Sequence, residues 1–64
     1  MNARIEADYM LIPLFSSITG YSEKAVRRKI EDGKWIEGVH YTRAPDGHIT
    51  MSLKAYYAWA QGKQ

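Results

Sequence analysis

The chain has 64 residues, a hydrophobic fraction of 45% and a net charge of only +2 at neutral pH, as expected for one small globular domain. A domain of this size buries about 60% of its unfolded surface, so a large active-site cleft is not expected. Without cysteine the chain can form neither a disulfide nor a thiolate metal site, and two histidines are too few for structural zinc. We expect a single domain over residues 1–64 that is not an enzyme and needs no cofactor or metal.

The ends of the chain and its first apolar run carry little targeting information. The run over residues 9–15 is too short to span a bilayer, lacks a basic region ahead of it and is interrupted by Pro13. We therefore expect a cytoplasmic protein with no membrane partner. Residues 9–12 predict a short strand, whereas residues 1–7 and the polar residues 62–64 are expected to be loose termini.

The most informative segment is residues 22–33, which combine a complete helix with a cluster of basic side chains. Ser22 is a good N-cap, and Gly33 can adopt the left-handed conformation that ends a helix. Val26 and Ile30 are four residues apart and share one face, which predicts packing on a core. Residues 22–32 carry four basic and three acidic side chains, net +1. Taken alone, this polar face is also typical of a solvated helix in an ordinary domain.

The preceding residues 13–21 predict the shorter partner of this helix. Pro13 suits the first turn of a helix, and Gly20 suits the turn that follows. A short helix, a turn with glycine and a longer basic helix are typical of a helix-turn-helix, in which the second helix enters the DNA major groove. The charge distribution agrees, because residues 24–43 hold six basic and three acidic residues, net +3.

Residues 40–51 predict a β-hairpin with its turn at residues 44–47, where proline fixes one dihedral and glycine accepts positive φ. A hairpin directly after a helix-turn-helix is interpreted as a wing, and the alternative is a plain surface hairpin. Arg43 and His48 flank the tip and are expected to approach a phosphate backbone or a minor groove.

The last predicted helix covers residues 53–61, begins at the N-cap Ser52 and ends at Gly62. Trp35, in the segment before the hairpin, is expected to seal one edge of the core. Trp59 lies off the centre of the predicted stripe, so it either completes the core edge or offers an apolar patch to a partner protein. The stripe expected to face the core consists of Leu53, Tyr56, Tyr57 and Ala60.

The order of helix-turn-helix, wing and final helix over residues 11–59 resembles the small excisionases of phages and prophages. The resemblance rests on residues 18–33, then Trp35, residues 37–38, residues 40–41, the Ala-Pro-Asp-Gly tip at residues 44–47, and Ile49. It implies an α+β fold, specifically a small MerR-like winged helix-turn-helix domain. It also implies a recombination directionality factor, which binds direct repeats on the attachment-site arm, bends the DNA and directs phage integrase toward excision. The implied partners are double-stranded DNA, a tyrosine integrase and further copies of the chain that bind DNA cooperatively.

The resemblance also assigns DNA contacts. Base-edge contacts are expected from Glu23, Lys24, Arg27 and Arg28, and phosphate contacts from Lys29 and Lys34. For Glu23 the alternative is a favourable charge near the helix N-terminus. The expected DNA-binding residues are Ser22, Glu23, Lys24, Arg27, Arg28, Lys29, Lys34, Arg43 and His48.

Two other functions fit the sequence. One is a transcriptional regulator that uses the same winged helix on a phage promoter. The other is a small adaptor that engages a protein through Trp35, Tyr57 and Trp59. A salt titration separates the adaptor from the DNA-binding functions, because phosphate contacts impose a steep dependence on ionic strength and an apolar interface does not.

Overall fold

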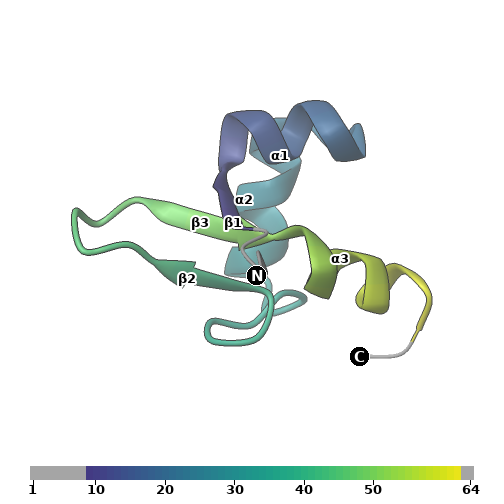
Figure 1. Ribbon diagram of the computed structural model, residues 1–64. Helices are drawn as coiled ribbons and strands as arrows, with labels where there is room; N and C mark the ends of the chain where they lie inside the picture. Colours follow the sequence, from purple (N-terminus) through teal and green to yellow (C-terminus); the bar gives the residue numbers. More distant parts are fainter. Residues whose placement is uncertain (1–8, 63–64) are drawn as a thin grey trace, which may run out of the picture.

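The computed structural model describes residues 9–62, which form three helices and one antiparallel three-stranded sheet (Figure 1). This α+β arrangement confirms the predicted winged helix-turn-helix fold class, with the hairpin as the wing. The termini expected at residues 1–7 and 63–64 lie outside the described residues, whereas Gly62 belongs to the turn that ends the last helix. The elements are β1 (Tyr9–Leu11), α1 (Ile12–Thr19), α2 (Glu23–Glu31), β2 (Tyr41–Arg43), β3 (Ile49–Ser52) and α3 (Leu53–Ala60).

Local signals set the boundaries of the helix-turn-helix. Pro13 lies in the first turn of α1, and Gly20 ends that helix with φ +89° while its N–H donates to the Ser16 carbonyl. The Ser22 hydroxyl accepts the Ala25 N–H at 3.0 Å and so caps α2. These boundaries confirm both predicted helices and place a three-residue turn, 20–22, between them.

The sheet has the strand order β1-β3-β2. Met51 of β3 lies opposite Met10 of β1 on one side and opposite Tyr41 of β2 on the other. The predicted strand at residues 9–12 is therefore confirmed to within one residue, since Ile12 begins α1. Pairing between β1 and β3 was not part of the sequence-based expectation, and it anchors the base of the hairpin to the start of the helix-turn-helix.

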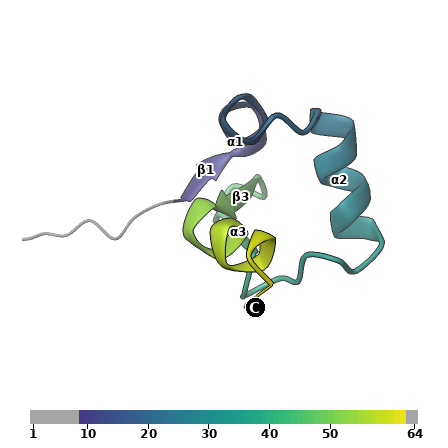
Figure 2. The ribbon, with the colours of Figure 1, turned by 90° about the vertical axis from the view of Figure 1, so that its right-hand side faces the viewer.

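Trp35 joins the two sides of the core. In Figure 2, α2 and α3 lie on different sides of the molecule, and the Trp35 ring, only 1% exposed, packs between their side chains. Its ring meets Phe15 edge-to-face at 5.7 Å and Trp59 at 5.2 Å. The prediction of a structural Trp35 is confirmed. The buried apolar residues are Ile12, Phe15, Val26, Trp35, Tyr41 and Met51.

The predicted stripe of α3 is wrong in its second half. Leu53 and Tyr56 pack against the core as expected, but Tyr57 is 52% exposed and Ala60 is also exposed. Trp59, three residues after Tyr56, takes their place. A short helix can turn only one face inward, and burying an indole removes more apolar surface from water than burying an alanine methyl group. The face of α3 that turns toward the core is therefore the one that places Trp59 beside Trp35.

Candidate nucleic-acid interface

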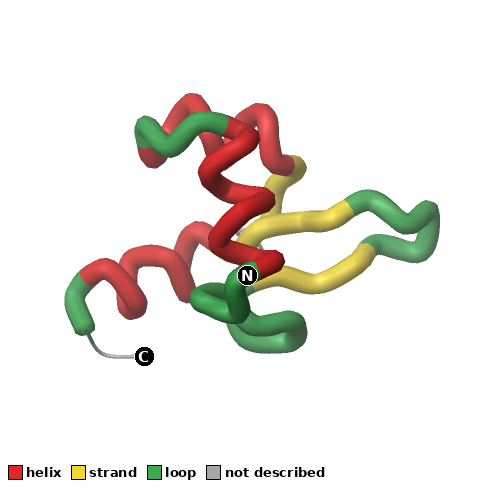
Figure 3. The backbone as a smooth tube through the Cα atoms, turned by 180° about the vertical axis from the view of Figure 1, so that it is seen from behind, coloured by secondary structure: helices red, strands yellow, loops and turns green. Residues whose placement is uncertain are grey.

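The hairpin and α3 extend in opposite directions from the body of the domain (Figure 1). Seen from behind in Figure 3, α2 lies close to the base of the hairpin, and the loop of the hairpin reaches beyond the helices. The two elements predicted to contact DNA are therefore both available on the part of the surface away from α3.

Strand register directs Arg43 toward the helices. Residues two apart on a strand share a face, so Arg43 lies on the same face as the buried Tyr41. Its partner across the hairpin is Ile49, which shares this face with the buried Met51. The hairpin extends past the core. The core therefore covers this face at Tyr41 and Met51, whereas at Arg43 and Ile49 the face is accessible to solvent beside α2.

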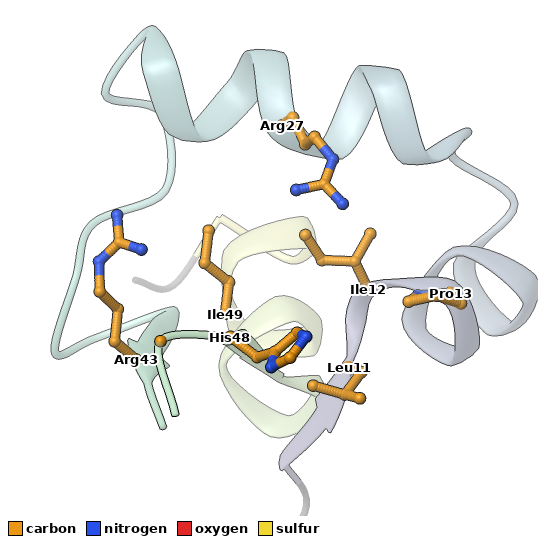
Figure 4. A pocket seen from close by; sticks show the side chains of 8 residues that line it. Leu11, Ile12, Pro13, Arg27, Arg43, His48 and Ile49 are labelled. Carbon is orange, nitrogen blue, oxygen red and sulfur yellow. The ribbon is translucent and has the colours of Figure 1, made fainter. Parts of the chain in front are cut away.

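A groove with a volume of about 400 Å³ lies at this point (Figure 4). Arg27 of α2 and Arg43 of β2 point into it from different sides, and both side chains are exposed. Ile12, Pro13 and Ile49 supply the apolar part of its lining, and Ile49 is drawn between the two arginines. The fold thus brings together two predicted DNA-binding arginines that are 16 positions apart in the sequence.

Hydrogen bonds within the turn fix the tip of the wing. Asp46 accepts the His48 N–H at 3.0 Å and lies 3.0 Å from Nδ1 of the His48 ring. These backbone and side-chain hydrogen bonds lower the pKa of the Asp46 carboxyl group. Gly47 adopts φ +93°, as the predicted turn requires. His48 is therefore held by its neighbour, while it also lines the groove.

The polar face of α2 is exposed along its length. Glu23, Lys24 and Arg28 all lie on it, and Arg28 pairs with Asp32 at 3.3 Å. Such an exposed ion pair contributes little to stability, so Arg28 can exchange Asp32 for another partner at low cost. Ser22 is engaged as the N-cap, and Lys34 is exposed in the turn after the helix. Neither Ser22 nor Lys34 lines the groove.

Lys29 has a contact that the sequence pattern did not indicate. Its ammonium lies over three aromatic rings, at 5.1 Å from the centroid of Tyr21, 5.8 Å from Trp59 and 6.0 Å from Trp35. These rings come from the turn before α2, from α3 and from the segment between α2 and β2, so only the folded chain assembles them. Their negative faces attract a cation. Lys29 is therefore half-buried at the edge of the core, and it does not line the groove.

The residues expected to engage a protein partner are mostly occupied within the fold. Trp35 is buried and Trp59 packs on it, which leaves Tyr57 as the one exposed member of that predicted set. The expectation that Trp35 could contact a protein partner is therefore wrong, because this side chain is buried. Leu14 and Ile18 of α1 are about half exposed, which the sequence analysis did not anticipate.

His40 has a structural position. It is 3% exposed, and its Nδ1 accepts the Ile36 N–H at 3.0 Å. Burial lowers the pKa of its imidazole. In residues 9–62, no three histidine, aspartate or glutamate side chains are grouped so that they could hold a metal ion. In the same residues, no helix has the length and apolar character needed to cross a membrane.

Comparison with known proteins identifies the family of the chain. The family described as Putative excisionase (DUF1233) matches residues 10–64, which include every helix and all but the first residue of the sheet. No curated protein and no solved structure matches the chain. The match covers far more than half of the sequence, and it includes both α2 and the hairpin. The chain therefore belongs to this excisionase family.

Proposed function

We propose that the protein binds double-stranded DNA on the arm of a phage attachment site, bends it, and directs a tyrosine integrase toward excision. The single observation that carries this proposal is the groove between α2 and the hairpin, into which Arg27 and Arg43 both point. Two elements that each direct an exposed arginine to the same side of a chain of the excisionase family fit a duplex better than they fit a small substrate.

The dimensions of α2 suit the major groove. An α-helix with its side chains is about 10 to 12 Å across, which matches a major groove about 12 Å wide, and the nine residues of α2 extend roughly 14 Å along it at about 1.5 Å per residue. Glu23, Lys24 and Arg28 would then face base edges, where arginine can bind guanine and glutamate can accept from cytosine. With α2 in this position, Arg43 would lie on the adjacent backbone or minor groove.

The distribution of charge supports a weak interaction per molecule. The polar face of α2 carries two acidic residues, Glu23 and Glu31, beside its basic residues. The Lys29 ammonium is turned toward aromatic rings. Few phosphate contacts give low non-specific affinity, because each released counterion contributes to binding. Cooperative binding of several copies on neighbouring sites would compensate. Contacts from both α2 and the hairpin would also offset the elastic cost of a bend.

A gel-shift experiment tests this proposal. Duplexes from the attachment-site arm and a scrambled sequence of equal length are titrated with the protein at several salt concentrations. We expect tighter binding to the arm, affinity that falls steeply with salt, and altered mobility of circularly permuted fragments as the sign of a bend. Equal, weak binding to both duplexes would contradict the proposal. Tight binding to a phage promoter but not to the arm would instead identify a transcriptional regulator.

A further inference from the structure

We propose that the groove between α2 and the hairpin binds one phosphodiester group of the DNA backbone, held between Arg27 and Arg43. This inference rests on the proposed function and specifies how the duplex is gripped. It assigns Arg27 to the backbone, whereas the resemblance to excisionases implies a base-edge contact for this residue.

The first observation is which basic side chains already have a partner within the fold. Arg28 pairs with Asp32, His48 pairs with Asp46, and Lys29 lies over aromatic rings. Across residues 9–62, Arg27 and Arg43 have no acidic partner within salt-bridge distance; the same holds for Lys24 and Lys34, but these two do not line the groove. The two arginines that lack an anionic partner there are thus the two that point into the groove.

The second observation is the charge of the groove lining. Its eight residues include two arginines and one histidine, and none of them is acidic. Two guanidinium groups that face the same space repel one another, and an anion between them converts this repulsion into attraction. The planar fork of arginine matches the geometry of phosphate oxygens and can donate two hydrogen bonds at once. The chemistry of the lining therefore favours a phosphate-type anion.

The third observation is the apolar part of the groove lining. Leu11, Pro13 and Ile49 line the groove, and Leu11 remains 47% exposed although it belongs to a paired strand. Base edges are read mainly by hydrogen bonds, which these side chains cannot make. They can instead pack against the carbon atoms of a deoxyribose next to the bound phosphate. The combination of arginines with an apolar surface thus favours a sugar–phosphate unit over a base edge.

Affinity measurements on charge-removing variants test the assignment. Arg27→Ala, Arg43→Ala and the double variant are compared with Arg28→Ala, a matched control on the same helix. We expect each groove variant to weaken binding roughly 10- to 100-fold, the size of a charge-assisted hydrogen-bond contact, on arm and scrambled DNA alike. Arg28→Ala should instead reduce the preference for the arm. Because all three side chains are exposed, we expect the variants to have the circular dichroism spectrum of the wild type, which serves as the control for folding.

The salt dependence distinguishes one shared phosphate from two separate ones. The slope of log affinity against log salt changes by about 0.9 per phosphate contact. If both arginines hold the same phosphate, the double variant should have a slope shallower by about one, not by about two. Loss of arm preference in Arg27→Ala, or a slope change of about two in the double variant, would overturn the assignment. Neither result would affect DNA binding by the wild-type protein, so the proposed function is tested separately.

Chemical removal of one backbone charge gives a second test. A series of duplexes carries a single neutral methylphosphonate at successive positions of the arm. One position should weaken wild-type binding to the level of the double variant and have no further effect on that variant. If no such position exists, the groove does not bind the backbone. Inorganic phosphate alone serves as the probe for a free-anion site. We expect it to shift the side-chain NMR signals of Arg27 and Arg43 only weakly and to be displaced by arm DNA. Binding of inorganic phosphate that arm DNA does not displace would overturn the assignment to DNA.

Discussion

Replacing Lys29 with methionine should separate a structural lysine from a DNA-binding one. The substitution keeps an unbranched stem of similar length but removes the ammonium that lies 5.1 to 6.0 Å from three ring centroids. One cation–π contact contributes about 0.5 to 1 kcal/mol when exposed and about 2 kcal/mol when desolvated. Because Lys29 is half-buried, we expect the free energy of unfolding to fall by about 1 to 2 kcal/mol.

Thermal unfolding followed by circular dichroism measures this loss. In a domain of this size, 1 kcal/mol corresponds to a shift of about 4 to 8 °C in the midpoint. Lys24→Met, on the exposed face of α2, is the matched control and should leave the midpoint nearly unchanged. The log–log salt slope of DNA binding should be the same for Lys29→Met and wild type. An unchanged midpoint with a slope shallower by about one would refute this reasoning and place Lys29 on a phosphate.

Three further predictions concern the fold. Phe15→Ala should lower the free energy of unfolding by about 3 to 5 kcal/mol, because this side chain is fully buried; an unchanged melting midpoint would contradict that. Ser22→Ala should cost about 1 kcal/mol through loss of the α2 cap, measurable by denaturant titration against the exposed Ser17→Ala. Burial lowers the pKa of His40, so as the pH falls the unfolded chain binds a proton at this residue before the folded chain does. Neutral His40 therefore stabilises the folded state above the ordinary pKa of 6.5, and this stabilisation is lost as the pH falls below that value. His40→Asn should flatten that acidic side of the stability profile, and an unchanged profile would show that another group titrates.

Signals that act over a few residues made much of the fold predictable. The Ser22 cap, the Gly20 turn and the hairpin turn at residues 44–47 are each encoded within one short segment, and each lies where the sequence indicates. The face of α3 was less predictable. Leu53 and Tyr56 fit two alternative stripes equally well, and only the position of Trp35 decides between Trp59 and Tyr57.

The candidate interface depends more strongly on tertiary structure. The sequence shows that Arg27 and Arg43 are basic and lie on predicted DNA-binding elements. It does not show that both point into one groove, because this depends on the pairing of β1 with β3 and on the register of the hairpin. The position of the Lys29 ammonium also depends on tertiary structure, because its three aromatic neighbours come from separate segments of the chain. Its location next to Ile30 and three residues after Val26 was the one local sign of partial burial.

An in vitro recombination reaction tests whether the protein directs a tyrosine integrase toward excision. The cognate tyrosine integrase is incubated with excisive and integrative substrates, with and without this protein, and the products are quantified. We expect that excision requires the protein, that integration does not, and that Arg43→Ala reduces excision in step with its loss of DNA binding. Excision that proceeds equally well without the protein, while the protein binds no attachment-arm DNA, would contradict the account.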